Sequence, residues 1–134
     1  MTGGAGFIGS NLVDALVERG EDVVCDRYLD SSVAYQGIAR ALGAEAVRDL
    51  SLLVTERLLP DQTFLVLLDV DQAFARSGDH HDRIEREGVD FMRRVDEAYR
   101  TLAELEPERI VAVDGTRSAE EIAEEVRERV RPLL

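Results

Sequence analysis

Two segments near the start of the chain carry residues suited to phosphate chemistry. The first is a glycine-rich run with glycines at Gly4, Gly6 and Gly9. This spacing allows a tight turn and a close approach of the backbone to a phosphate, and a helix that begins there directs N–H groups at the anion. In the second segment, Asp26 and Arg27 precede a polar and aromatic loop. A carboxylate can hold hydrated Mg²⁺, and a guanidinium can bind a phosphate through two parallel hydrogen bonds.

The elements that must position these residues alternate between strands and helices. Apolar runs predict strands at 22–26, 63–70 and 109–113. Helical spacing of apolar residues predicts helices at 11–19, 31–42, 45–58, 71–76, 84–106 and 118–131. In the long fifth helix, the residues expected on the inner side are Phe91, Val95, Tyr99, Leu102 and Leu105. This alternation predicts an α/β fold, a parallel sheet covered by helices.

The composition narrows the classes of function. The chain has 134 residues, which suits a single domain, and its net charge of −12 argues against a general nucleic-acid or anionic-membrane surface. No apolar run reaches the roughly 20 residues that span a bilayer. The single cysteine, Cys25, excludes an intrachain disulfide and fits a reducing cytoplasm.

The glycine run lacks the strand that normally leads into such a turn. Only Met1 and Thr2 precede it. In the α/β folds that use this turn the first strand lies inside the sheet, so the usual central first strand is expected to be missing or truncated. Each large apolar side chain lost with it would remove about 1.5 to 3 kcal/mol of stability.

The glycine run can be interpreted in two ways. With Thr2 and Gly3 ahead of Gly6 and Gly9, residues 1–20 resemble the start of the extended short-chain dehydrogenase/reductase family, which implies NAD(P) binding. That family also uses a Tyr-x-x-x-Lys pair, but this chain contains no lysine. The spacing from Gly4 to Gly9 also matches a P-loop, although Ser10 and Asn11 occupy the places of its Lys and Ser/Thr. The candidate cofactor-binding residues here are Gly4, Gly6, Gly9 and Ser10.

Most of the remaining chain, residues 23–134, closely resembles bacterial thymidylate kinase. The stretches that carry the resemblance are 24–37, 59–65, 82–85 with Asp90, Phe91 and Arg94, and 111–117. They occur in the family's order. The resemblance implies a P-loop-kinase-like fold and the transfer of a phosphoryl group from ATP to dTMP with Mg²⁺.

The resemblance implies roles for five residues of the first half. Asp26 is expected near the metal and the phosphates, and Arg27 at the phosphate of dTMP. Ser32 and Gln36 are expected along the thymine edge. Tyr35 is expected under the sugar, where the family selects deoxyribose.

The resemblance also implies a lid and an ATP site in the second half. Arg76 and Arg83 flank the expected lid at 77–83, and lid arginines stabilise the charge that develops during phosphoryl transfer. The turn that matches the family's adenine-binding loop contains Asp114, Gly115 and Thr116.

These inferences favour one domain, 1–134, in which a reductase-like start (1–22) joins a thymidylate-kinase-like portion (23–134). The leading hypothesis is a cytoplasmic dTMP kinase that binds dTMP and ATP and turns over slowly, because the P-loop lysine is absent. An NAD(P)-binding module and a non-catalytic fragment remain as alternatives. The family generally pairs through helices, so a homodimer through 45–58 is possible.

Overall fold

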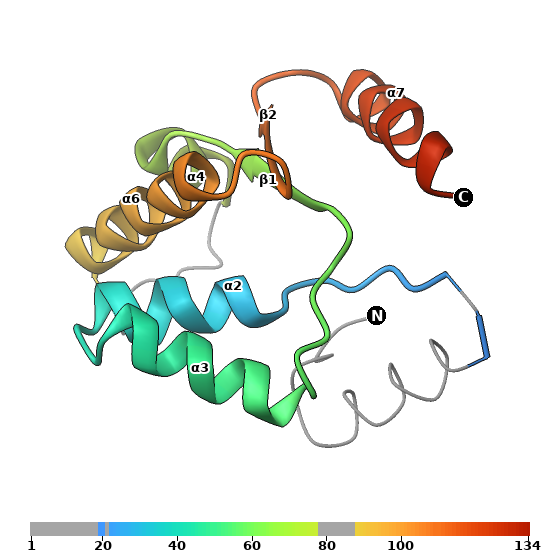
Figure 1. Cartoon of the computed structure of the whole chain (residues 1–134). Coiled ribbons are helices and arrows are strands. Elements are labelled where there is room, and N and C mark those ends of the chain that lie inside the picture. The colour runs from blue at the N-terminus through green and yellow to red at the C-terminus, as the bar shows by residue number, and fades with distance from the viewer. Residues whose placement is uncertain (1–18, 21, 78–87) are drawn as a thin grey trace. The chain divides into compact units, whose positions relative to one another are not determined.

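The computed structural model describes residues 19–20, 22–77 and 88–134 (Figure 1). The backbone separates into two compact units, Met1–Leu59 and Pro60–Leu134. The predicted helix at 11–19 and the glycines of the N-terminal run lie outside the described residues, apart from Arg19. Each unit is considered by itself below.

The first unit is built from two adjoining helical segments. The α-helix α2 (Leu29–Ser32) continues directly into η1 (Val33–Ala39), a π-helix, and α3 (Ala44–Val54) contacts both. The buried apolar residues of this unit are Leu29, Val33, Ala34 and Ala39. The helix predicted at 31–42 is therefore confirmed as a helical segment, but it begins two residues earlier and most of it has the wider π geometry.

The strand predicted at 22–26 is not formed. Residues 22–25 have no regular secondary structure, and Asp26 forms only an isolated bridge. Val24, expected in a buried strand, is 86% exposed. A strand exists through its ladder of hydrogen bonds to neighbours, and in the described residues this segment has no such ladder.

The helix α3 ends four residues before the predicted end. Its C-terminal carbonyl groups are capped locally, because the Thr55 hydroxyl donates to the Ser51 carbonyl at 2.9 Å. Glu56 and Arg57 then take positive φ values of 49° and 65°, which the helix cannot continue through. Sequence alone marked only the later proline, Pro60.

The second unit contains a two-stranded parallel sheet. Strand β1 (Thr63–Leu67) pairs with β2 (Ile110–Asp114) in a register that runs from Thr63 opposite Ile110 to Leu67 opposite Asp114. The prediction had extended the first of these strands to Val70. It ends earlier because the side chain of Asp69 accepts hydrogen bonds from the backbone of Asp71 and Gln72 and so starts a helix.

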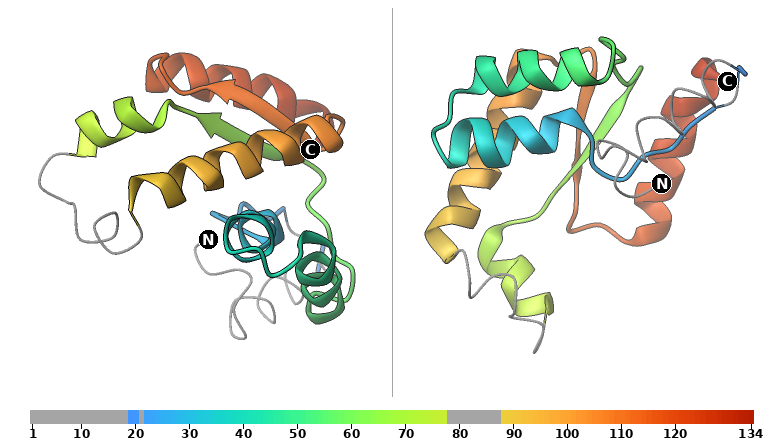
Figure 2. Two further views of the ribbon diagram at one scale, coloured as in Figure 1. Left: turned by 90° about the vertical axis from the view of Figure 1, so that its left-hand side faces the viewer. Right: turned by 90° about the horizontal axis from the view of Figure 1, so that it is seen from below.

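Three helices and a short 3-10 turn complete the second unit (Figure 2). They are α4 (Val70–Ser77), α6 (Val89–Leu105), α7 (Ala119–Val130) and η2 (Arg131–Leu133). The helix α6 contacts both strands and α4. No helix among the described residues is long and apolar enough to cross a membrane.

The apolar side of α6 forms much of the core of this unit. Its buried residues are Phe91, Val95, Ala98 and Leu102, joined by Ile110 and Val113 of β2. The prediction was right for Phe91, Val95 and Leu102. It was wrong for Leu105, which is 72% exposed at the last position of the helix. Tyr99 is only half-buried, because Ala98 occupies the centre of the inner side.

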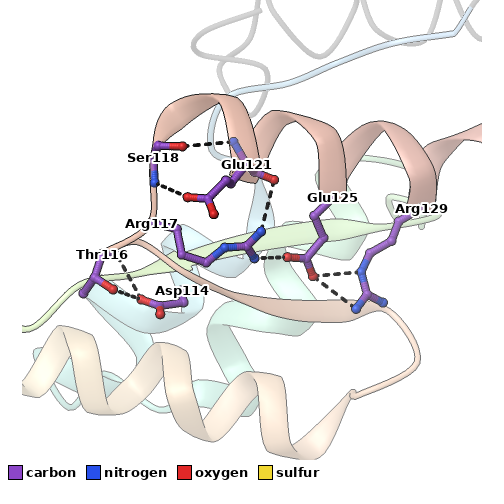
Figure 3. A network of polar contacts seen from close by, with 7 residues as sticks. All are labelled: Asp114, Thr116, Arg117, Ser118, Glu121, Glu125 and Arg129. Atoms are coloured by element: carbon purple, nitrogen blue, oxygen red, sulfur yellow. Dashed lines mark hydrogen bonds and ion pairs between the residues drawn. The ribbon is translucent and has the colours of Figure 1, made fainter.

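The last long helix begins as predicted. Ser118 and Glu121 form a capping box, in which the Ser118 hydroxyl accepts from the Glu121 N–H and the Glu121 carboxylate accepts from the Ser118 N–H (Figure 3). Such a box satisfies two helix-terminal N–H groups at once. It fixes the direction in which the chain leaves β2.

Candidate functional site

Arg27 is held in place by an aromatic partner. Its Nη2 donates to the Tyr35 hydroxyl at 2.7 Å, and its guanidinium carbon lies 4.8 Å from the centre of the Tyr35 ring. The backbone of Arg27 takes a positive φ of 65°, which is uncommon for a residue with a side chain. Strained backbone of this kind occurs often at ligand-binding sites. The structure therefore presents a fixed, exposed guanidinium directly after Asp26.

The π-helix places three predicted site residues in one short run. Ser32 is the last residue of α2, and Tyr35 and Gln36 lie within η1. The Arg40 N–H bonds to the Tyr35 carbonyl at 3.2 Å, five residues back, as a π-helix requires. Most π-helical segments are a single turn, and they are frequent at functional sites.

Gln36 carries a buried oxygen without a partner. Among the described residues, Oε1 of Gln36 is the buried side-chain polar atom that lacks a hydrogen bond. An unsatisfied buried acceptor costs about 1 to 3 kcal/mol. A ligand with an N–H group at this position would recover that cost. The family resemblance implied that Gln36 contacts a ligand, but it could not indicate this unsatisfied oxygen.

The glycine that follows Gln36 permits close packing against α3. A Cβ atom on Gly37 would lie 2.9 Å from Cα of Ala44, too close for any larger residue. Gly37 is buried, and its carbonyl accepts from the Gly43 N–H at 3.0 Å. The contact fixes η1 against the start of α3, so it also fixes the backbone that carries Tyr35 and Gln36.

Asp26 supplies an exposed carboxylate next to Arg27. No group of three or more His, Cys, Asp or Glu residues in the described parts of the chain could hold a metal ion. Mg²⁺ is commonly bound through one or two carboxylates together with substrate phosphates. A single carboxylate beside the exposed guanidinium of Arg27 is compatible with that pattern.

In the second unit, the carboxyl end of β2 forms a compact polar turn (Figure 3). Oδ1 of Asp114 accepts from the Thr116 N–H at 2.8 Å and from the Thr116 hydroxyl at 2.7 Å. The hydroxyl bond, and then the N–H bond, hold the pKa of Asp114 below its ordinary value. Between them, the Gly115 N–H donates to the Leu67 carbonyl at 2.7 Å and ties the turn to β1.

Arg117 joins this turn to the helix that follows. Its guanidinium donates to the Glu125 carboxylate and to the Glu121 carbonyl, and Glu125 also accepts from Arg129 at 3.2 Å (Figure 3). The hydrogen bond from Arg117 is the main reason that the pKa of Glu125 lies below its ordinary value, and the bond from Arg129 adds to it. The network keeps the Arg117 side chain along α7.

A hollow of about 360 Å³ lies at the carboxyl ends of the two strands. Its lining residues are Leu67, Asp69, Gln72, Arg100, Ala112, Val113, Asp114 and Thr116. Asp114 and Thr116 were expected at a nucleotide site, whereas Asp69, Gln72 and Arg100 were not. Asp69 could have been found, because like Asp114 it comes at the end of an apolar run. Arg100 could not be recognised from the sequence, because Asp96 and Arg100 are spaced i, i+4 like an ordinary surface ion pair on a helix.

Comparison with known proteins decides the family. The family description "Thymidylate kinase" matches residues 9–126, which is most of the chain. The chain belongs to the thymidylate kinase family. This confirms the kinase resemblance, and the match begins well before Val23, where the motifs had placed its start. The comparisons give no support to the reductase-like interpretation of the glycine run or to NAD(P).

Individual thymidylate kinases agree with the family match. The chain is 48% identical over 128 residues to thymidylate kinase from Clavibacter michiganensis subsp. michiganensis, with 92% of this chain and 60% of the relative covered. It is 51% identical over 121 residues to the enzyme from Leifsonia xyli subsp. xyli, covering 88% of this chain and 57% of the relative. The chain thus spans somewhat less than two thirds of the length of these thymidylate kinases.

A solved structure shows the same fold. The crystal structure of thymidylate kinase from Ehrlichia chaffeensis superposes with a TM-score of 0.64 and 22% sequence identity, over 88% of this chain and 54% of that one. The α/β architecture with a parallel sheet, predicted from the alternation of apolar runs, is therefore confirmed. A sheet of two strands in the described residues is consistent with the truncated sheet that was expected.

The structure describes only some of the predicted site residues. The candidates Gly4, Gly6, Gly9, Ser10 and Arg83 lie outside the described residues. Arg76 lies on α4. The structure brings together Arg27 and Tyr35, with Gln36 next in sequence, in the first unit, and Asp114, Gly115 and Thr116 in the second.

Proposed function

We propose that this chain contributes the nucleotide sites of a thymidylate kinase, which transfers the γ-phosphoryl group of ATP to dTMP. The observation that carries the proposal is the arrangement around η1, where a fixed guanidinium at Arg27 lies against Tyr35 and Gln36 has an unsatisfied buried oxygen. One group suits a phosphate and the other suits a base edge, as a nucleoside monophosphate requires. The family match makes dTMP the proposed acceptor.

On the acceptor side, each residue has a chemical reason for its role. Arg27 binds the phosphate of dTMP, because a guanidinium matches two phosphate oxygens in its plane. Oε1 of Gln36 accepts a hydrogen bond from a ring N–H of thymine, and Ser32 adds a hydroxyl at the same edge. Tyr35 packs against the sugar and at the same time orients Arg27 through its hydroxyl.

On the donor side, the turn of Asp114, Gly115 and Thr116 is the proposed contact for the adenine of ATP. Its geometry is fixed by the two hydrogen bonds to Asp114 and by the bond from Gly115 to β1. Arg76 and Arg83 would approach the transferring phosphoryl group as parts of a lid. Backbone N–H groups of Gly4, Gly6, Gly9 and Ser10 would contact the ATP phosphates.

Asp26 is the proposed carboxylate ligand, through water, of the Mg²⁺ that accompanies ATP. When bound, Mg²⁺ neutralises the charge of the phosphate oxygens. Positioning of the reactants together with electrostatic stabilisation supplies most of the catalysis in phosphoryl transfer. A cytoplasmic location, favoured by the single cysteine, is part of the proposal.

A second copy of the chain is the proposed partner of α3. This helix leaves a large apolar face exposed, with exposed fractions of 62% at Leu50, 76% at Leu53 and 57% at Val54. Antiparallel pairing of two such helices would bury this face. We expect sedimentation to show a dimer that Leu53→Glu dissociates. An unchanged mass for this variant would exclude α3 as the interface.

Titration with dTMP tests the acceptor site. Wild-type protein should bind dTMP, and Arg27→Ala should weaken binding by at least about tenfold, because a charge-assisted hydrogen bond is worth about 1.5 to 3 kcal/mol. Arg57→Ala is a matched control, since Arg57 is exposed, lies in the same unit and has the same backbone φ of 65° as Arg27. Equal losses in both variants, or saturation by NAD without binding of dTMP, would refute the proposal.

A further inference from the structure

The hollow at the carboxyl ends of β1 and β2 has room for a small ring. Its volume of about 360 Å³ falls within the range of small-molecule sites, about 300 to 1,000 Å³. It lies at the edge of a parallel sheet where α/β proteins bind ligands. Asp114 and Thr116 connect it to the turn proposed above for the adenine of ATP, while Arg100 enters from α6.

The charges that line the hollow disfavour an anionic ligand. Asp69 and Asp114 place two carboxylates around it, and Arg100 is the cation among its lining residues. A phosphate would be repelled by the carboxylates. A neutral aminopurine would fit better, because it offers ring nitrogens to N–H donors, an amino group to oxygen acceptors and a flat face to a guanidinium.

Arg100 is oriented from its own helix. Its Nε donates to Oδ2 of Asp96 at 2.8 Å, one helical turn earlier. This bond, and then attraction by Asp96 and Asp69, raises the pKa of Arg100. Within the described residues, no other hydrogen bond or ion pair of the Arg100 guanidinium is found, and its side chain is 46% exposed. The plane of the guanidinium is thus fixed through Nε, and its Nη groups remain available to a ligand.

We propose that Arg100 binds the purine base of the donor nucleotide, by stacking on the ring or donating to its nitrogens, and that Asp96 is the residue that positions it. The inference rests on the proposed function, because it adds a specificity-determining residue to the proposed ATP site. It assigns base recognition to α6 in addition to the turn after β2. It also separates base recognition in this hollow from phosphate recognition elsewhere.

Titration with adenosine, which carries no phosphate, isolates this contact. The titration is followed by NMR on the whole chain. Adenosine should saturate the wild-type protein in the millimolar range, and it should bind to Arg100→Gln about five- to thirtyfold more weakly. Asp96→Asn should show a smaller loss in the same direction, because it loosens Arg100 without removing it. Arg127→Gln should match wild type, since Arg127 is an exposed arginine of the same unit that pairs with Glu124 on α7.

The test also distinguishes failure of this inference from failure of the proposed function. Absence of adenosine binding in the wild type, or equal affinity in Arg100→Gln, overturns the inference whatever happens with dTMP. Weaker binding of inorganic pyrophosphate to Arg100→Gln would also overturn it, because it would show that Arg100 serves a phosphate. Loss of dTMP binding with adenosine binding retained would instead count against the proposed acceptor site.

Discussion

At the scale of single residues, the polar side chains between Arg27 and Gln36 show what sequence can and cannot indicate. The resemblance to thymidylate kinase made Arg27, Ser32, Tyr35 and Gln36 candidates. The hydrogen bond between Arg27 and Tyr35 and the burial of the Gln36 oxygen depend on the π-helical turn. No local sequence pattern predicts a π-helix, so these features could come only from the structure.

Gln36→Met should separate stability from binding. Methionine has a similar length and no polar atom, so the variant removes the unsatisfied oxygen, and the free energy of unfolding should rise by about 1 kcal/mol. Binding of dTMP should weaken at the same time, because the acceptor for the base is lost. Urea unfolding and dTMP titration measure the two effects. Gln62→Met is the control, and a variant at Gln36 that loses both stability and binding would contradict the expectation.

At the scale of elements, the interiors of helices and strands were predicted better than their ends. Apolar spacing located α6 and β2, each of which buries one side, and it also located α3, whose apolar side is largely exposed. The ends depend on local polar contacts, such as the Asp69 side chain that starts α4 and the Thr55 hydroxyl at the end of α3. Only the box of Ser118 and Glu121 has a sequence signature strong enough to fix a boundary. The strand expected at 22–26 failed because a strand also needs neighbours.

Gly115→Ala should destabilise the sheet of the second unit. A Cβ atom on Gly115 would lie 2.6 Å from the Leu67 carbonyl oxygen and 3.1 Å from Cγ1 of Val66, so the two strand ends would have to move apart. We expect a loss of at least about 2 kcal/mol in urea unfolding. Gly88→Ala is the control, because Gly88 has a positive φ of 79° but open space around it. Equal losses of stability in the two variants would show that the close contact between Gly115 and β1 is unimportant.

The start of α7 should weaken in acid. The pKa values of Asp114, Glu121 and Glu125 are all held below their ordinary values by hydrogen bonds, so the unfolded chain binds more protons than the folded chain in the acid range. The stability that these groups contribute is fully present above their pKa values in the unfolded chain, which are about 4. It is lost as the pH falls through their lower pKa values in the folded chain. Urea midpoints measured between neutral pH and about pH 3 should show this loss.

Thr116→Val tests the hydrogen bond that contributes most to the lowered pKa of Asp114. The variant removes the hydroxyl that donates to this carboxylate, so its urea midpoint should depend less on pH than that of the wild type. Thr101→Val is a matched control, because the Thr101 hydroxyl donates to a backbone carbonyl and not to a carboxylate. The account fails if the two variants show the same pH dependence.

At the scale of the whole molecule, the two units each hold one part of the proposed chemistry. The first carries the residues proposed for dTMP, and the second carries those proposed for adenine. Alternation of strands and helices was enough to predict the fold class, because a parallel pair of strands needs a helical crossover. The division into two compact units was not predictable, since no change of composition marks the boundary near Leu59 and Pro60.

Slow turnover with retained binding is the outcome expected for the whole chain. The sequence contains no lysine, so no lysine side chain contacts the β- and γ-phosphates of ATP as in an ordinary P-loop. Most catalysis in phosphoryl transfer comes from such positioned charge, so its loss should lower the rate by orders of magnitude while leaving the dTMP contacts intact. A coupled assay of ADP release, run beside thymidylate kinase from Clavibacter michiganensis as a positive control, measures the difference. Turnover within the usual kinase range of about 1 to 100 s⁻¹ would show that another group, such as an arginine, replaces the missing lysine.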